Sequence, residues 1–270
     1  MPRRLAAHEV PRYGHGSRKA RGCIPSAIGM LLLSTMTVAI VIPTYNEAGT
    51  IEELVRRIFA LAISGLEVLV IDDSSNDGTI EKLRALQKQF PITVVIRPKK
   101  SGLGSALKDG LTLAKERGAN ATITLDADLS HDPDRIAEML KKISAGVDLV
   151  VGSRRIKGGK IVGWGAGRTL MSRAAMEFSR RMLGITARDV TSGFRAYSRK
   201  VIDVVPLDKV GSTGYAFQEE MLYRTQQMGF CIEEIPIIFH DRRQGKSKLG
   251  IKDIFEFFVT VVRLRFQKQI

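Results

Sequence analysis

Short apolar runs alternate with longer amphipathic segments through the first half of the chain. The apolar runs, which we expect to be buried strands, are 38–43, 67–71, 92–96, 121–125 and 148–151. The segments between them, which we expect to be helices, are 52–63, 76–89, 103–117 and 132–144. Strands that alternate with helices in this way are typical of right-handed βαβ units. The pattern therefore predicts an α/β fold with a mostly parallel central sheet.

The second half of the chain predicts fewer strands. Helices are expected at 168–183 and 215–228, and a late strand at 231–239. Pro236 lies inside that strand, and because proline cannot donate a ladder hydrogen bond, the strand should lie at an edge or contain a bulge. Along one side of the first of these helices run the apolar residues Leu170, Met171, Ala174, Ala175, Phe178 and Met182.

The last apolar segment, 251–266, is amphipathic. It is shorter than the roughly 20 apolar residues that a spanning helix needs, and its charged residues are Lys252, Asp253, Glu256, Arg263 and Arg265. We expect an interfacial helix with basic ends, or a helix that docks on the core. The chain thus divides into a basic extension at 1–36, expected to be disordered, a globular domain at 37–240, and a basic loop with an amphipathic tail at 241–270.

Charge adds information about partners. The 270 residues carry a net charge of +14, with basic residues concentrated near both ends. Such an excess predicts an anionic partner, either nucleic acid, lipid head groups or phosphorylated substrates. Proteins that bind nucleic acid usually place aromatic residues among the basic ones. Aromatic residues make up only 6% of this chain, which disfavours nucleic acid.

Three polar clusters follow three of the expected strands. They are Pro-Thr-Tyr-Asn-Glu at 43–47, Asp-Asp-Ser-Ser at 72–75 and Asp-Ala-Asp-Leu-Ser at 126–130. Open α/β sheets bind ligands beyond the carboxyl ends of their strands. One such cluster is readily explained as a loop or a helix cap, but three on one edge favour a binding site.

The third cluster indicates a metal. Asp126 and Asp128 are two residues apart, so their side chains should project to the same side. Two carboxylates about 4 Å apart repel each other by roughly 1–4 kcal/mol, and a divalent cation reverses that sign. Oxygen ligands favour Mg²⁺ or Mn²⁺. An aspartate pair in the turn that caps the helix at Pro133 is the alternative. No glycine-rich dinucleotide fingerprint or P-loop lysine is present, which disfavours dehydrogenases and P-loop nucleotidases.

A set of eight motifs occurs in order along the chain. They are VIPTYNE (41–47), IDDSSNDGT (71–79), GLGSAL (102–107), DADLSHDP (126–133), GSR (152–154), TSGFRAYSR (191–199), GYAFQEEM (214–221) and GKSKLG (245–250). From about residue 38 to 250 this set resembles the inverting family-2 glycosyltransferases, in particular the dolichol-phosphate (polyprenol-phosphate) mannosyltransferase branch. The resemblance implies a GT-A nucleotide-sugar fold, GDP-mannose as the donor, a polyprenyl (dolichyl) monophosphate as the acceptor, and Mg²⁺ or Mn²⁺.

The same resemblance implies a set of site residues. Those expected to hold the donor are Pro43, Tyr45, Glu47, Ile71, Asp73, Asp126, Ala127, Asp128, Arg154, Arg242 and Lys248. Asp126 and Asp128 would also bind the metal, and Ser130 stands where some relatives have a glutamine ligand. Asp128 and Arg154 would be catalytic, with Arg154 facing the phosphates. Arg168 and Ser172, four residues apart on one helical face, would receive the acceptor phosphate.

The expected reaction needs no general base, because a phosphate acceptor is largely ionised at neutral pH. Three alternatives remain: UDP-glucose as the donor, a sugar hydroxyl as the acceptor, and a basic nucleic-acid-binding protein. Many members of the family carry C-terminal spanning helices, and none is evident in this sequence. We therefore expect peripheral attachment to the cytoplasmic face of a membrane through 168–183 and 251–266, or a separate membrane subunit.

Overall fold

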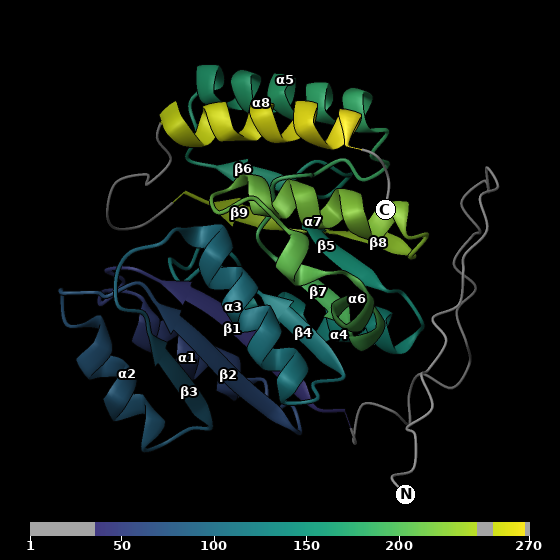
Figure 1. Cartoon of the computed structure of the whole chain (residues 1–270). Helices are drawn as coiled ribbons and strands as arrows, with labels where there is room; N and C mark the ends of the chain where they lie inside the picture. The colour runs from purple at the N-terminus through teal and green to yellow at the C-terminus, as the bar shows by residue number, and fades with distance from the viewer. Residues whose placement is uncertain (1–35, 242–250, 268–270) are drawn as a thin grey trace, which may run out of the picture.

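A seven-stranded sheet runs through the molecule in the order β3-β2-β1-β4-β7-β5-β8 (Figure 1). The computed structural model describes residues 36–241 and 251–267. The strands of this sheet are β1 Val38–Thr44, β2 Leu66–Asp72, β3 Ile92–Ile96, β4 Ala121–Thr124, β5 Leu149–Ser153, β7 Arg195–Ser198 and β8 Ile232–Pro236. Strand β7 is antiparallel to both neighbours, and the other pairs are parallel. The predicted mostly parallel sheet is therefore confirmed.

Helices cover both faces of the sheet. They are α1 Ile51–Ala60, α2 Thr79–Gln87, α3 Leu103–Glu116, α4 Ile136–Ser144, α5 Ala166–Leu183, α6 Arg199–Val204, α7 Ala216–Gln227 and α8 Ile251–Phe266, with short 3-10 helices η2 Pro133–Arg135 and η3 Leu207–Lys209. Strands β6 Lys160–Val162 and β9 Ile238–His240 form a small second sheet. The predicted elements agree with these bounds to within a few residues, and the predicted C-terminal helix is present. Apart from Met36, the predicted N-terminal extension lies outside the described residues.

Strand β7 was not predicted, and it separates β4 from β5. Its four residues do not form an apolar run, because the first of them is Arg195. The Arg195 side chain is nevertheless fully buried. The Arg195 guanidinium donates hydrogen bonds to the carbonyl oxygens of Ser192, Val190 and Gln218. These bonds offset the cost of burying the charge, so a strand forms where the sequence pattern predicted no element.

The predicted late strand is divided in two. Strand β8 ends at Pro236 and lies at the edge of the main sheet, and β9 leaves that sheet to pair with β6. Pro236 is paired with Ser153, the last residue of β5. An edge position or a bulge was predicted for the strand that contains Pro236, and the structure shows the edge position.

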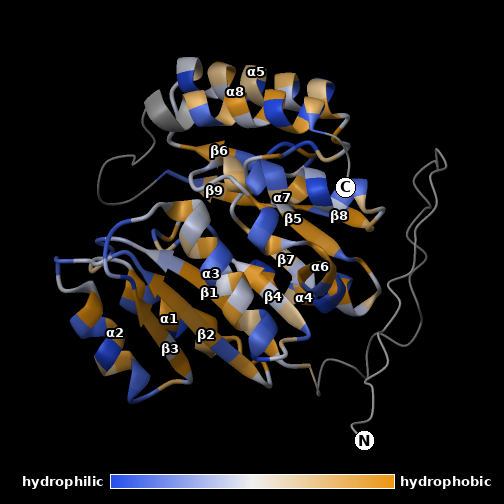
Figure 2. Ribbon diagram, viewed as in Figure 1, coloured by the Kyte–Doolittle hydropathy of each residue, from blue (hydrophilic) through white to orange (hydrophobic). Residues whose placement is uncertain are grey.

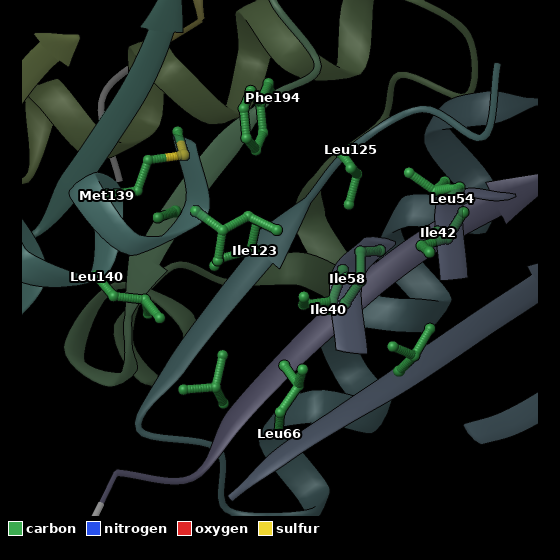
Figure 3. Packing of buried hydrophobic residues seen from close by; sticks show 14 of the residues in the cluster. Ile40, Ile42, Leu54, Ile58, Leu66, Ile123, Leu125, Met139, Leu140 and Phe194 are labelled. Atoms are coloured by element: carbon green, nitrogen blue, oxygen red, sulfur yellow. The ribbon is translucent and has the colours of Figure 1, made fainter. Parts of the chain in front are cut away.

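Two apolar clusters pack on opposite faces of the sheet. On one face Ile40 and Ile42 of β1 pack with helices α1, α2 and α4, and Figure 3 shows them beside Leu54 and Ile58. On the other face Val41 belongs to a cluster that includes residues of α3 and of helices α5 to α8. Helix α3 approaches β1 closely at Gly110, where an added Cβ would lie 2.2 Å from Cγ1 of Val41. The alternation along β1 explains how one apolar strand supports two helical layers.

Helices α5 and α8 lie side by side as an outer layer (Figure 1). Helix α8 buries Phe257, Val261 and Leu264 against the core. One of its faces therefore docks on the core, which was one of the two predicted alternatives. Its other face carries Phe255 and Phe266, which are 70% and 78% exposed, and Figure 2 shows apolar and polar residues mixed along both helices. Across residues 36–241 and 251–267, no helix is both long and apolar enough to span a bilayer.

Candidate active site

The loops after β1 and β2 hold each other in place by hydrogen bonds. The Asp72 carboxylate accepts from Thr44 Oγ1 (2.7 Å) and from the backbone N–H and hydroxyl of Ser75 (2.8 and 2.7 Å). Asn46 N–H donates to Ser75 Oγ (2.8 Å), and Asn46 Oδ1 accepts from Asn76 N–H (3.0 Å). The first two predicted polar clusters therefore form one unit.

Each of the three predicted polar loops contains a residue with left-handed backbone. Asn46, Ser74 and Leu129 have φ of 55°, 59° and 60°. Within the described residues, Ala62 is the one other non-glycine residue with positive φ. Such conformations cost energy, persist where surrounding contacts impose them, and cluster at functional sites. Their presence in all three loops supports a common site.

A pocket opens at this edge of the sheet. Its lining residues are Pro43, Thr44, Tyr45, Glu47, Asp73, Lys100, Gly102, Leu103, Ala106, Asp126, Ala127, Asp128, Gly214 and Tyr215. Every predicted donor residue in the loops after β1 and β4 lies in this wall, and so does Asp73. Lys100, which sequence reasoning missed, places its ammonium 4.0 Å from the centre of the Tyr45 ring. Arg242 and Lys248, the predicted closing residues, lie outside the described residues.

Asp73 and Ile71 have different positions relative to this pocket. Asp73 is 4% exposed, and its carboxylate contacts Arg97 Nε (2.8 Å) and accepts from the N–H groups of Ser101 and Gly102 (3.2 and 3.1 Å). It therefore orders the loop that leads into α3 while it lines the pocket. The Ile71 side chain is fully buried under α3, and it is not part of the pocket wall.

Asp126 and Asp128 lie together in the pocket wall, as predicted, but in different environments. Asp128 is 4% exposed, and its Oδ1 accepts from Ser130 N–H (3.0 Å) and from the Ser130 hydroxyl (2.5 Å). The Asp126 side chain is 30% exposed. Ser130, the predicted third metal ligand, is thus engaged in orienting Asp128.

This pair of carboxylates suits a divalent cation. Their mutual repulsion is relieved by a cation, and hard oxygen donors match Mg²⁺ or Mn²⁺. In the described part of the chain, no group of three or more His, Cys, Asp and Glu side chains is gathered at metal-binding spacing. A cation held by Asp126 and Asp128 would therefore complete its coordination with phosphate oxygens or water.

His131 packs beneath this loop, against two aromatic rings. Its ring lies 5.3 Å from that of Phe194 and 5.5 Å from that of Phe239. Burial lowers the pKa of His131 to about 4, and the positive charge of Arg154 acts in the same direction. His131 is therefore neutral at pH 7 and supports the loop by packing.

Arg154 is held by a buried carboxylate that sequence reasoning missed. Its Nε and Nη2 donate to the two oxygens of Asp189 at 2.7 and 2.6 Å, and Nη2 also donates to Thr191 Oγ1 (2.8 Å). Burial alone would raise the pKa of Asp189, but the charge and hydrogen bonds of Arg154 lower it overall. The one available signal was an acidic residue just before the TSGFR segment. A catalytic role for Arg154 stays a prediction.

The predicted acceptor residues of α5 lie close to the end of β5. Ser172 Oγ accepts from Arg155 Nη2 at 3.0 Å. Arg168 Nη1 lies 3.2 Å from Asp241 Oδ2, and its guanidinium stacks 4.0 Å from the centre of the Trp164 ring. Arg155, which the sequence analysis did not select, connects the β5 loop to α5.

Two adjacent glutamates in the GYAFQEEM segment had no predicted role, and the structure gives them separate ones. Glu220 accepts from Ser212 and pairs with Arg224 and Arg263, which ties α8 to α7. Glu219 is fully buried and accepts a hydrogen bond from the Ser179 hydroxyl of α5. Burial raises the pKa of Glu219 to about 8, so this side chain is largely protonated at neutral pH.

Comparison with known proteins agrees with this arrangement. The model of the family described as Glycosyl transferase family 2 matches residues 39–205. An undecaprenyl-phosphate mannosyltransferase of Micrococcus luteus is 38% identical over 229 residues, which cover 84% of this chain and 93% of that protein. A polyprenol monophosphomannose synthase of Mycolicibacterium smegmatis is 37% identical over 224 residues, which cover 82% and 84% of the two chains.

Solved structures show the same fold at lower identity. Glucosyl-3-phosphoglycerate synthase from Mycobacterium tuberculosis in complex with UDP superposes with a TM-score of 0.66 and 21% identity, over 89% of this chain and 84% of that one. The complex of the same enzyme with Mn²⁺, UDP and phosphoglyceric acid gives a TM-score of 0.65 at 20% identity, over 88% and 81%. The predicted GT-A fold is thereby confirmed.

The buried Glu219 gives a stability prediction with a defined sign. Between pH 4.5 and about 8 the folded protein keeps the Glu219 proton while the unfolded chain releases it, so this group makes stability fall as pH rises. Glu219→Gln removes the proton equilibrium and keeps the shape. We expect urea unfolding to show that the free energy of unfolding of the variant, relative to that of the wild type, is higher at pH 8 than at pH 5. The control Glu177→Gln alters an exposed carboxylate of α5 and should show no such trend; a pH-independent difference for Glu219→Gln would contradict the assignment.

Proposed function

We propose that this chain, which belongs to glycosyl transferase family 2 and is a glycosyltransferase, transfers mannose from GDP-mannose to a polyprenyl (dolichyl-type) monophosphate with inversion. The observation that carries the proposal is the placement of two unlike sites at one sheet edge. One is the pocket whose wall carries Asp126 and Asp128, and the charge of Asp126 acts on the nearby Arg154. The other is formed by Arg154 and Arg155, of which Arg155 bonds to Ser172 of α5. The names of the curated relatives supply the sugar and the lipid class.

The pocket suits a nucleotide diphosphate donor. Tyr45, stacked by Lys100, and the loops fixed by Asp72 form one wall, and Asp126 and Asp128 form the other. Mg²⁺ or Mn²⁺ bound by these two carboxylates would neutralise charge on the diphosphate as the nucleotide departs. Ser130 holds Asp128 in one orientation, so the carboxylate does not need to reorganise during the reaction.

The acceptor side suits a phosphomonoester. A phosphate oxygen is already anionic at neutral pH and attacks without help from a base. The guanidinium of Arg154, fixed by Asp189, would reduce the repulsion between the two phosphorylated substrates.

The outer layer of α5 and α8 supports peripheral attachment to the cytoplasmic face of a membrane. Its exposed apolar residues are Leu170, Met171, Phe178, Phe255, Phe258, Val259, Val262 and Phe266. The exposed Arg173, Arg181 and Arg265 lie on the same two helices. Apolar side chains combined with basic ones match the boundary between acyl chains and anionic head groups. Such attachment would bring the α5 site to the level of a lipid phosphate.

The donor and acceptor assignment is tested by product formation. Purified protein is incubated with polyprenyl phosphate, Mn²⁺ and, in turn, radiolabelled GDP-mannose, UDP-glucose and other sugar nucleotides. We expect a lipid-soluble product from GDP-mannose. A product from UDP-glucose alone would refute the mannose assignment, and transfer to sugar hydroxyls in place of the lipid would refute the acceptor. Tight nucleic-acid binding with a steep salt dependence and no transferase activity would favour the nucleic-acid alternative.

The role of Asp128 is tested by Asp128→Asn. We expect kcat to fall by about 1000-fold, equivalent to roughly 4 kcal/mol of lost transition-state stabilisation. Mn²⁺ binding in the presence of GDP, measured by electron paramagnetic resonance, should weaken in parallel. The control Asp132→Asn changes a nearby carboxylate that pairs with Arg57 and should retain both properties. Near-normal turnover of Asp128→Asn would remove the metal assignment.

Membrane attachment is tested with point substitutions, because a deletion of α8 would also remove buried core residues. The double variant Phe255→Ser/Phe266→Ser should bind phosphatidylglycerol-containing vesicles about a hundredfold more weakly or worse, since each of the two buried phenyl rings contributes roughly 1.5–3 kcal/mol. Val204→Ser changes an exposed apolar residue of α6 and serves as the control in vesicle sedimentation. Wild-type protein that fails to sediment with vesicles would contradict direct attachment and favour a separate membrane subunit.

A further inference from the structure

Arg155 follows Arg154 in the chain and contacts α5. It follows Ser153, the last residue of β5, whose hydroxyl accepts a hydrogen bond from Arg155 N–H at 3.2 Å. Its guanidinium extends to α5, where Nη2 donates to Ser172 Oγ. Because β5 runs parallel to β4, Arg155 leaves the sheet at the same edge as the Asp126–Asp128 wall. Arg155 therefore lies at the same edge of the sheet as the proposed donor pocket, and its side chain reaches α5.

Arg154 and Arg168, two other arginines of this region, are already compensated by carboxylates. Arg154 is paired with Asp189 at 2.6 Å, and Arg168 is paired with Asp241 at 3.2 Å. Arg155 forms no ion pair with any carboxylate in the described chain, and its Nε is buried without a hydrogen-bond partner. A guanidinium with five donors in this state lacks an anion.

The charges around Arg155 also favour the binding of an anion. Partial burial lowers the pKa of Arg155, and the positive charges of Arg154 and Arg173 lower it further, against the opposing effect of Asp189. Cations placed together at a partly buried position repel one another unless an anion joins them. A phosphate group, with up to two negative charges and three acceptor oxygens, meets both needs.

We propose that Arg155, together with Ser172 Oγ, binds the phosphate of the acceptor directly and makes the site select a phosphomonoester over the corresponding alcohol. This inference rests on the proposed function and adds a specificity-determining residue to it. The uncompensated guanidinium supplies the charge, and the Arg155–Ser172 hydrogen bond fixes the spacing of the two donors. In this arrangement, Asp189 and Asp241 hold Arg154 and Arg168 in position, and Arg155 supplies the guanidinium charge that has no carboxylate partner.

The proposal is tested with Arg155→Gln and Arg155→Lys in detergent micelles, with a short-chain polyprenyl phosphate as the acceptor. We expect Arg155→Gln to raise the KM for the acceptor at least tenfold and to leave the KM for the nucleotide sugar within twofold. Arg155→Lys, which keeps the charge and loses the planar fork, should fall between Arg155→Gln and the wild type. The matched control is Arg84→Gln, which removes an exposed charge from α2 and should leave both constants unchanged.

A second comparison separates direct binding from mere support of Ser172. If Arg155 only positions Ser172, Arg155→Gln will have no further effect once Ser172→Ala is present. We expect it to raise the acceptor KM again in that background. Direct binding of farnesyl monophosphate and farnesol, measured by calorimetry, should show that the wild type prefers the phosphate and that Arg155→Gln largely loses this preference.

The outcomes distinguish this inference from the proposed function. A wild type that binds farnesyl monophosphate and forms lipid-linked product, with an Arg155→Gln variant that does the same at unchanged acceptor KM, overturns the Arg155 assignment alone. A lower kcat at unchanged acceptor KM also overturns it. A wild type that does not bind farnesyl monophosphate overturns both. If Arg155→Gln loses acceptor binding in an enzyme that proves to use another sugar nucleotide, the assignment stands and only the donor is corrected.

Discussion

The strand order of the sheet is the constraint on which the site depends. Strands β1, β2, β4 and β5 run in one direction, so their carboxyl ends and the loops that follow them meet at one edge. Most of the acidic groups lie at the ends of β2 and β4, the two strands that flank β1, whereas Arg154 and Arg155 follow β5, beyond β7. The fold thereby places acidic and basic groups side by side without bringing them together in a single mutually neutralising cluster.

Buried charges in this molecule are compensated in a consistent way. Arg195 is satisfied by backbone carbonyls, Arg154 by Asp189, and Glu220 by Arg224 and Arg263. Glu219 follows the other route, because it keeps its proton and bonds to Ser179. Unpaired buried charges are costly, so the partly buried guanidinium of Arg155 stands out against this background.

Sequence patterns predicted most of the fold because buried parallel strands and amphipathic helices have strong periodic signals. The run at 92–96 and the segment at 251–266 have the same bounds in the structure as in the prediction. Strand β7 gave no such signal, because its burial depends on carbonyl groups from other segments that satisfy Arg195. Likewise, Leu170 and Met171, expected on the apolar side of a helix, are largely exposed, since α8 covers only part of that side.

The sequence by itself determined the alternation of strands and helices, the three polar loops and the aspartate pair, because these depend on residues adjacent in the chain. Only the tertiary structure decided which of the predicted site residues lie in the pocket and which are engaged by other groups. Ile71 lies under α3 instead of in the pocket, Ser130 bonds to Asp128, and Asp189 holds Arg154. Contacts of the last kind join residues 35 positions apart, and no local pattern encodes such pairings, because they arise when distant segments pack on one sheet.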